Sequence, residues 1–139
     1  MSPVKTARAS IPMNALFRAL ADSTRLRLLN LIADREICVC YFVQILRISQ
    51  PKVSRHLAYL RRAGIVATRR NGKWIHYRLA IPDGHAASSI LRKALAHLKD
   101  SPAMQRDLLR LSSACCTPGK YEPLRGAPQP ARLTKSVAR

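Results

Sequence analysis

Acidic side chains are scarce in this chain of 139 residues. Seven Asp and Glu stand against 25 Lys and Arg, which gives a formal net charge of +18 at pH 7. Such an excess of one sign repels itself unless a partner uses it, so we expect a polyanionic partner. A basic protein whose charge serves only solubility is the alternative. Aromatic residues make up only 5% of the chain, which disfavours an RNA-binding protein that stacks bases on exposed rings.

Long apolar runs are also missing. The longest uncharged stretch, Ile37 to Leu46, is too short to span a bilayer, and the first ten residues contain no apolar signal core. We therefore expect a cytoplasmic protein without a membrane partner, whose thiols stay reduced. The chain also lacks a Gly-rich phosphate loop, paired carboxylates and a nucleophile placed with His and an acid, so we expect no enzyme.

The few acids avoid the middle of the chain. None lies between Ile37 and Pro82, whereas this interval holds nine cations. They are Arg47, Lys52, Arg55, Arg61, Arg62, Arg69, Arg70, Lys73 and Arg78. Each Lys or Arg that pairs with a phosphate releases a condensed counterion, so the interval predicts contact with a nucleic acid.

Apolar spacing and turn residues predict a mainly α chain with one β-hairpin. The expected elements up to the hairpin are four helices, at 14–21, at 22–32 with cap residues at 22–24, at 36–46 and at 49–62, followed by the hairpin at 65–79. Two helices are expected after it, one at about 84–98 with Asp83 as its cap and one from Ser101 to near Ser113. Asn71-Gly72 is expected to form the hairpin turn, because both residues accept positive φ. The chain after Cys116 is rich in proline and is expected to be irregular.

The helices at 36–46 and 49–62 followed by the hairpin describe a winged helix-turn-helix. In the second helix Val53, Leu57 and Leu60 form the buried stripe, and polar side chains occupy the other faces. The candidate DNA-binding residues are Ser49, Gln50, Lys52, Ser54, Arg55 and His56 on this helix and Arg69, Arg70 and Lys73 on the hairpin. Gln and Arg suit base edges, whereas Lys and Ser suit phosphates.

Four segments of this chain resemble one family. They read ALADSTRLRLL at 19–29, EICVC at 36–40, SQPKVSRHLAYLRRAGIV at 49–66 and RRNGKWIHYRL at 69–79. They are similar to segments of the ArsR/SmtB family of metal-responsive repressors, and the likeness covers residues 13 to 100. The resemblance implies a homodimeric winged helix that pairs through its first and fifth helices and binds double-stranded, pseudo-palindromic operator DNA.

The EICVC segment resembles the inducer site of the arsenic-responsive branch of that family. There, two cysteines bind trivalent arsenic or antimony together with a third thiolate three residues later, a position that Val43 occupies here. The resemblance therefore implies Cys38 and Cys40 as ligands, with the third ligand supplied from elsewhere.

Cys115 and Cys116 are candidates for the missing thiolate. They are adjacent and fall in a predicted loop, where both thiols could orient freely. A trivalent metalloid prefers soft thiolate ligands, so the vicinal pair plus Cys38 or Cys40 would complete three. Our hypothesis is that inducer binding clamps the C-terminal segment onto the helix at 36–46. An organoarsenical would need only two thiolates, and small buried cysteines or a redox switch remain the alternatives.

Asp83, His85, His97 and Asp100 are similar to the zinc site on the fifth helix of the zinc-sensing branch. That site has ten residues between its histidines, whereas this chain has eleven. A step of 12 residues on a helix ends about 120° from its start, so the two pairs should face apart. We expect Asp83 and Asp100 to serve as caps.

The expected organisation has four parts. They are an arm at 1–12, a winged helix-turn-helix domain for DNA binding and dimerisation at 13–100, a helix with the vicinal cysteines at 101–117 and a basic tail at 118–139. The expected function is repression of a metal(loid) resistance operon, relieved when trivalent arsenic or antimony binds cysteine thiolates. The alternatives are a zinc- or redox-responsive repressor of the same fold and a non-specific basic nucleic-acid-binding protein.

Overall fold

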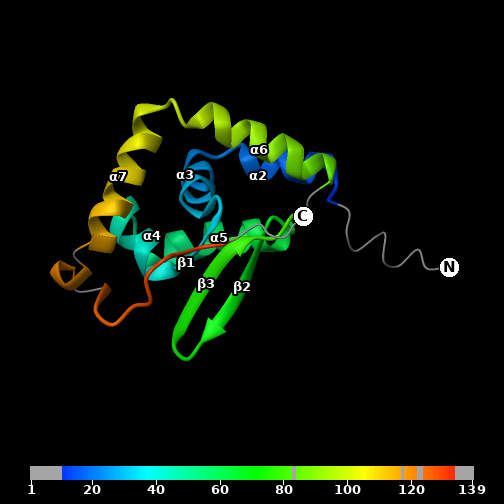
Figure 1. The fold of residues 1–139 in the computed structure, drawn as a ribbon. Helices are drawn as coiled ribbons and strands as arrows, with labels where there is room; N and C mark the ends of the chain where they lie inside the picture. Colours follow the sequence, from blue (N-terminus) through cyan, green and yellow to red (C-terminus); the bar gives the residue numbers. More distant parts are fainter. Residues whose placement is uncertain (1–10, 83, 117, 122–123, 134–139) are drawn as a thin grey trace.

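The computed structural model describes residues 11–82, 84–116, 118–121 and 124–133. Its elements are α2 (Met13–Leu20), α3 (Ser23–Ile32), β1 (Arg35–Cys38), α4 (Val39–Leu46), α5 (Gln50–Arg62), β2 (Val66–Asn71), β3 (Trp74–Leu79), α6 (Ala86–Leu98), α7 (Pro102–Cys116), the short 3₁₀ helix η1 (Pro118–Lys120) and β4 (Ala131–Arg132). Most of the predicted arm at 1–12 lies outside the described residues. Within them, the predicted winged helix-turn-helix is confirmed (Figure 1).

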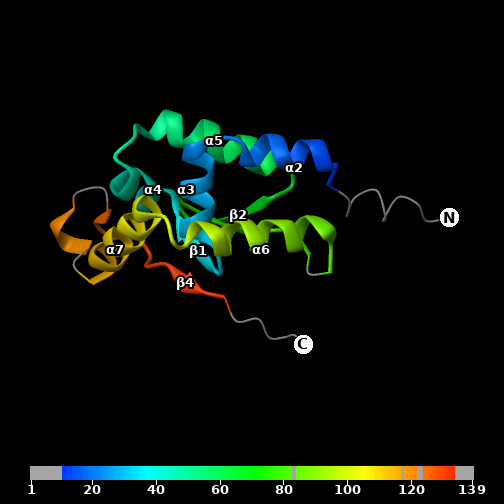
Figure 2. The same cartoon turned by 90° about the horizontal axis from the view of Figure 1, so that it is seen from above.

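The core forms where α3 meets α4, α5 and the sheet. Leu28, Leu29 and Ile32 of α3 are fully buried there, because the apolar stripe of α3 faces these elements. The Asp22 carboxylate accepts a hydrogen bond of 3.0 Å from the backbone N–H of Arg25, so the predicted N-cap of α3 is confirmed. Figures 1 and 2 show α6 and α7 wrapped around this centre.

The predicted helix at 36–46 is wrong over its first three residues. Residues 35–38 form β1, and the helix α4 begins only at Val39. β1 pairs antiparallel with β3, with Ile37 opposite Tyr77 and Cys38 opposite His76. Pairing with the open edge of the hairpin supplies backbone hydrogen bonds that helical spacing alone does not reveal, and it buries Ile37 and Cys38.

The helix-turn-helix joins α4 to α5 through a three-residue turn. Arg47 is left-handed at φ 57° and ends α4, and Pro51 lies in the first turn of α5, where its missing N–H costs nothing. Ser49 precedes α5 as predicted but makes no side-chain cap hydrogen bond. Gly64 follows α5 at φ 83°, the conformation expected after a helix end. The turn therefore separates α5 from α4.

The hairpin of β2 and β3 projects from the body of the molecule as a wing (Figure 1). The predicted hairpin is present, but its turn lies one residue later than predicted: Asn71 ends β2 and pairs with Trp74, so the two-residue loop is Gly72-Lys73. Gly72 has φ 63°, whereas Asn71 does not adopt the positive φ that was expected of it.

The C-terminal part departs from prediction in three places. α6 begins at Ala86 with His85 at its N-cap, and the predicted cap Asp83 lies outside the described residues. α7 continues to Cys116 instead of ending near Ser113. The tail is not wholly irregular, because η1 follows α7 and β4 pairs with β1 to give the strand order β2-β3-β1-β4. Leu124 is fully buried, which anchors the tail to the core.

None of the helices in the described part of the chain combines the length and the apolar composition that a bilayer span requires.

Candidate nucleic-acid interface and thiol site

The exposed face of α5 carries most of the candidate DNA-binding side chains. Gln50, Lys52 and Arg55 are exposed, as is Ser49 just before the helix, and Ser54 is half-buried. Val53, Leu57 and Leu60 on the opposite face are fully buried. The predicted division of this helix into a buried stripe and a polar face is confirmed, and the polar face can enter a groove of DNA.

His56 lies apart from that face. Its Nδ1 is 3.6 Å from Oδ2 of Asp22 and 3.4 Å from Nη1 of Arg25. The ring therefore lies against the start of α3, beside the Asp22 carboxylate that caps that helix. A role of His56 in contacting DNA stays a prediction.

The wing arginines are less free than the sequence suggests. Glu36 lies just outside the acid-free interval, yet it accepts from Arg69 with Nη2 at 2.7 Å and Nε at 3.1 and 3.2 Å. The Nε of Arg78 lies 3.8 Å from the same carboxylate. These cations lower the pKa of Glu36, with the Arg69 hydrogen bond as the largest cause and burial opposing it. Arg70 and Lys73, nearer the tip, are exposed.

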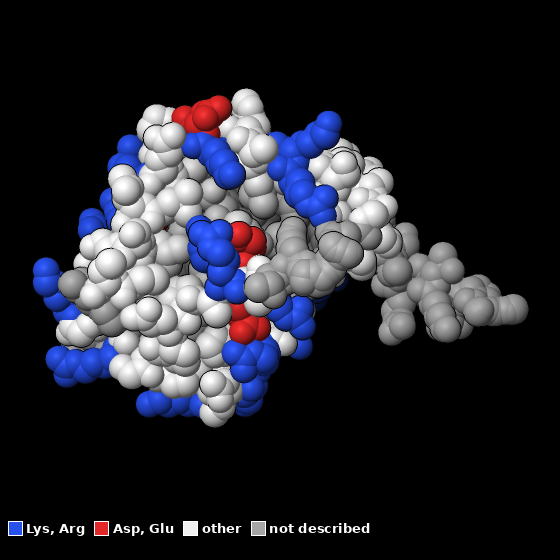
Figure 3. All heavy atoms as spheres, in the orientation of Figure 1, with Lys and Arg blue, Asp and Glu red and all other residues white. Residues whose placement is uncertain are grey.

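Figure 3 shows blue Lys and Arg side chains around the rim of one face, with the few red acids in contact with blue neighbours. Of the five acids among the described residues, Asp34, Glu36 and Asp107 form ion pairs with arginines.

The thiols of Cys38 and Cys40 touch each other at the start of α4. Cys40 Sγ donates a hydrogen bond to Cys38 Sγ at 3.2 Å. The two residues are not on a regular helix, because Cys38 is the N-cap and the last residue of β1. The junction between strand and helix thus brings together two sulfurs that would point apart on a regular helix.

This junction favours a thiolate. The hydrogen bond from Cys40 lowers the pKa of the Cys38 thiol to about 6, burial opposes the shift, and backbone N–H groups, including that of Ile75, add to it. The same bond raises the pKa of Cys40. A thiolate is the form that binds soft metals and metalloids, so the pair presents one ready ligand and one that must lose its proton on binding.

Tyr41 follows the pair and was not singled out from the sequence. Its side chain is fully buried, and its hydroxyl has no hydrogen-bond partner among the residues that the structure describes. Burial first, and then the charges of the sulfurs of Cys115, Cys40 and Cys38, raise the pKa of Tyr41 to about 12.

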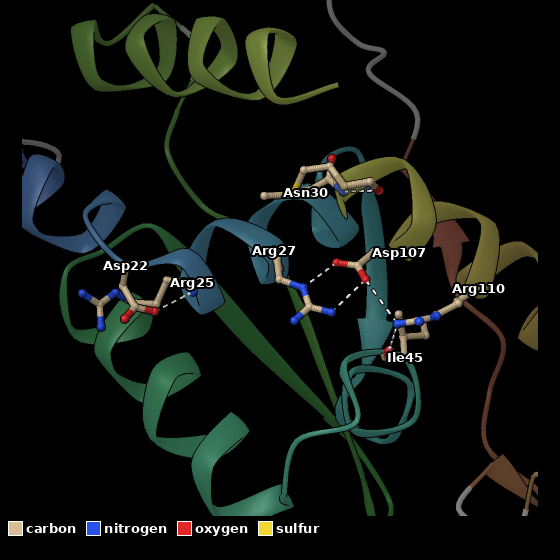
Figure 4. A network of polar contacts seen from close by, with 8 residues as sticks. Asp22, Arg25, Arg27, Asn30, Ile45, Asp107 and Arg110 are labelled. Atoms are coloured by element: carbon tan, nitrogen blue, oxygen red, sulfur yellow. Dashed lines mark hydrogen bonds and ion pairs between the residues drawn. The ribbon is translucent and has the colours of Figure 1, made fainter. Parts of the chain in front are cut away.

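The helix α7 brings Cys115 to this place. The buried carboxylate of Asp107 accepts from Arg27 of α3 at 2.7 and 2.9 Å, and Arg110 reaches the Ile45 carbonyl of α4 at 3.4 Å (Figure 4). Asn30 also donates to the Met104 carbonyl at 3.3 Å. The C-terminal segment that we expected an inducer to clamp onto α4 is therefore already packed there.

The predicted loop around the vicinal cysteines is wrong. Cys115 and Cys116 lie in the last turn of α7, where successive residues point about 100° apart. Cys115 is half-buried and Cys116 is exposed, so the two thiols do not face one point. Within the described residues no three His, Cys, Asp or Glu side chains converge as a metal site. Cys38 and Cys40 are brought together, and the use of Cys115 or Cys116 stays a prediction.

The chain matches the family described as bacterial regulatory protein, arsR family, over residues 22–68. It is 32% identical to the transcriptional repressor BigR of Xylella fastidiosa, with a TM-score of 0.54 over 63% of this chain and 83% of that one. The chain belongs to the ArsR family. Members of this family are transcriptional regulators, and the match spans the helix-turn-helix and the start of the wing.

Relatives within the ArsR family include regulators of arsenic resistance. The chain is 55% identical over 65 residues to the arsenic resistance transcriptional regulator ArsR1 of Pseudomonas putida, which covers 46% of this chain and 51% of that protein. It is 52% identical over 66 residues to the arsenical resistance operon repressor of Escherichia coli, covering 47% and 56%. The chain thus spans about half the length of the curated relatives it matches.

A solved structure with this fold is an antimony-specific transcriptional repressor, AntR. It is 31% identical to this chain, with a TM-score of 0.51 over 62% of this chain and 76% of that one.

Proposed function

We propose that this chain is a transcriptional repressor of a metal(loid) resistance operon that leaves its operator when trivalent arsenic or antimony binds cysteine thiolates. The observation that carries the proposal is the contact between Cys38 and Cys40, 3.2 Å apart at the first turn of the helix that leads into α5. The arsenic regulators among its relatives support the same conclusion.

In this proposal, α5 and the wing bind the DNA. Gln50 and Arg55 would contact base edges, and Lys52, Ser49 and Ser54 would contact phosphates. Arg70 and Lys73 would follow the DNA backbone from the wing tip, and Arg69 would do so only on leaving Glu36. The exposure of these side chains on one side of α5 and on the hairpin supports the assignment.

Coupling between the two sites would run through β1 and α4. Cys38 ends β1, which pairs with the wing strand β3, and Cys40 lies in α4, which packs against α5. An inducer that pulls the two sulfurs into one coordination sphere would move both elements. A coupling of about 1–3 kcal/mol, or roughly 5- to 150-fold in operator affinity, is typical of such switches.

The proposed assembly is a homodimer through α2 and α6 on a pseudo-palindromic operator. Phe17 and Met13 of α2 are exposed although they are large and apolar. The apolar stripe of α6 is only partly covered, since Ile90 and Leu95 are half-buried. The winged domain at 13–100 would then bind DNA and dimerise, and the segment at 101–117, which contains α7, would brace α4. The basic tail at 118–139 would add affinity that is independent of DNA sequence.

The test is a titration of operator-bound protein with arsenite and with antimonite, followed by fluorescence anisotropy of the labelled DNA. The wild type should release DNA, Cys38→Ser and Cys40→Ser should lose the response, and the double variant C115S/C116S should keep it. Unchanged DNA affinity in both titrations would exclude the proposal. A loss only in C115S/C116S would move the site to α7.

A redox-responsive repressor is the second candidate, favoured by the same contact. A peroxide would oxidise the Cys38 thiolate to a sulfenic acid, and the Cys40 thiol would displace water to form a disulfide. Operator affinity that is equal in the reduced and peroxide-treated protein excludes this candidate. Equal affinity for operator and random DNA at fixed salt would instead indicate a non-specific nucleic-acid-binding protein.

A further inference from the structure

An ion pair connects β2 to β1 across the strand that lies between them. The sheet places β3 between these two strands, yet the guanidinium of Arg69 on β2 donates to the Glu36 carboxylate on β1, with Nη2 at 2.7 Å and Nε at 3.1 and 3.2 Å. The side chain of Arg69 therefore crosses over β3 on one face of the sheet. His76 of β3 is the cross-strand partner of Arg69, so it lies on that same face, where it is only 3% exposed.

The thiol site begins on this face as well. Cys38 is the cross-strand partner of His76 on its other side, so Arg69, His76 and Cys38 form one row across three strands. Glu36 precedes Cys38 by two residues on β1, and alternate residues of a strand point to the same side. One short strand thus carries both the carboxylate that holds the wing arginine and a sulfur of the proposed inducer site.

The Glu36 carboxylate holds Arg69 in the way that a phosphate would. An arginine donates two N–H groups in parallel to carboxylates and to phosphates alike, so operator DNA must displace Glu36 to gain this contact. The side chain of Glu36 is only 11% exposed, and after the exchange its remaining partner is the Nε of Arg78 at 3.8 Å. Leaving a nearly buried carboxylate so weakly paired is costly, and the exchange therefore opposes operator binding.

The two sulfurs of the thiol pair already have a spacing that suits a trivalent metalloid. Sγ of Cys40 lies 3.2 Å from Sγ of Cys38, which for bonds of about 2.3 Å gives an angle of about 90° at the bound atom. A three-coordinate pyramid has angles of this size. Because a ligand stabilises the conformation that it fits, a bound inducer would hold the end of β1 in the present arrangement, in which Glu36 pairs with Arg69.

We propose that Arg69 exchanges between Glu36 and an operator phosphate, and that a metalloid on Cys38 and Cys40 returns it to Glu36. In the operator-bound protein, drawing the sulfurs together would move β1 back to the arrangement described above. Glu36 is thus the positioning residue through which the thiol site acts on the wing. This inference rests on the proposed function and deepens it, because it names the contact by which the inducer weakens operator binding.

The experiment measures operator affinity with and without arsenite for the wild type and for Arg69→Gln, Arg70→Gln and Glu36→Gln, each as the full chain. Fluorescence anisotropy of labelled operator DNA gives both dissociation constants, and their ratio is the response to the inducer. Arg70→Gln is the matched control, because Arg70 is the next residue of β2, is exposed, carries the same charge and points to the other face of the sheet.

Both arginine variants should bind the operator more weakly and with a salt slope lower by about one contact. Only Arg69→Gln should lose response, by roughly 3- to 10-fold, the range for one contact that is made in one of two states. Arg70→Gln should keep the wild-type response. Glu36→Gln should bind the operator more tightly without arsenite and lose as much response as Arg69→Gln.

The double variant E36Q/R69Q should lose no more response than either single variant, because both changes abolish the same exchange. Equilibrium dialysis without DNA should show that every variant binds arsenite as the wild type does. If Glu36→Gln failed this check, the comparison of Arg69→Gln with Arg70→Gln would decide alone, since Arg69 lies on a strand that does not touch β1.

Equal responses of Arg69→Gln and Arg70→Gln would overturn the proposal, and so would losses that add in the double variant. Either result leaves the proposed function intact as long as arsenite still releases the wild type from its operator. A wild type that keeps its operator affinity in the presence of arsenite and of antimonite would overturn both.

Discussion

Glu36 shows how one residue can change the meaning of a charge pattern. The nine cations between Ile37 and Pro82 predict an uninterrupted positive segment, and Glu36 precedes that segment by a single residue. In the fold, however, β1 lies beside β3, so the Glu36 carboxylate pairs with Arg69 and Arg78. The wing therefore offers DNA fewer free charges than its sequence contains.

Replacing Glu36 by Gln should release Arg69, whose side chain is already 50% exposed, to contact a phosphate. Each added phosphate contact changes the slope of log K against log salt by about −0.9. We expect the slope for Glu36→Gln to steepen by about one contact and operator affinity at low salt to rise. Fluorescence anisotropy at several salt concentrations measures both.

Asp34→Asn is the matched control for that substitution. Asp34 precedes β1 and pairs with Arg132 of β4 at 2.6 Å, away from the wing, so its removal should leave the slope unchanged. Equal slopes for the two variants and wild type would show that Arg69 contacts DNA while still paired, or not at all.

At the scale of elements, the sequence predicted correctly the features that depend on residues close to each other in the chain. The cap at Asp22, the buried stripe of α5 and the hairpin depend on neighbours in sequence, and each lies where expected, although the hairpin turn is one residue later than predicted. The strand β1 and the ordered tail depend on pairing across the chain, between Ile37 and Tyr77 and between Glu36 and Ala131. A helical period at residues 39–46 cannot reveal that the preceding residues complete a sheet.

The position of α7 also depends on contacts between residues far apart in sequence, and one of these contacts can be tested. Asp107 is 1% exposed and holds Arg27 of α3, whose side chain is 26% exposed. Asp107→Ala leaves the guanidinium without its partner, although it can turn toward solvent. We expect the free energy of unfolding to fall by about 2–3 kcal/mol, below the full cost of breaking a buried pair. Urea denaturation measures this loss.

Asp100→Ala serves as the control for the α7 contact. Asp100 is exposed between α6 and α7, so the change in free energy of unfolding should stay within about 0.5 kcal/mol. A Cys115 thiol that reacts faster with a maleimide in Asp107→Ala than in Asp100→Ala would show that the Arg27 pair keeps α7 on α4. Equal stability of the two variants would show that apolar packing alone docks the helix.

On the scale of the whole molecule, the sequence predicted the components of the site better than their arrangement. Cys38, Cys40 and the exposed face of α5 follow from short segments. The buried Tyr41 hydroxyl, which has no partner among the described residues, and the half-buried Cys115 result from packing between α4 and α7. The sequence of a single helix does not reveal such packing. The predicted convergence of three thiols required that packing to be known, and the helical end of α7 separates Cys115 from Cys116.

Two exposed apolar residues allow the proposed dimer interface to be tested. Phe17 of α2 is 52% exposed and Leu109 of α7 is 69% exposed. In the proposed dimer through α2 and α6, Phe17 would be part of the interface, so Phe17→Glu should yield a monomer in analytical ultracentrifugation. Because a monomer binds one half-site without the gain from linking two, its operator affinity should fall by about 10²-fold or more.

Leu109→Glu makes the same chemical change on α7 and should remain a dimer with unchanged affinity. If Leu109→Glu gave the monomer instead, the two copies would meet through α7, and the thiol site beside α4 would lie at the interface between them.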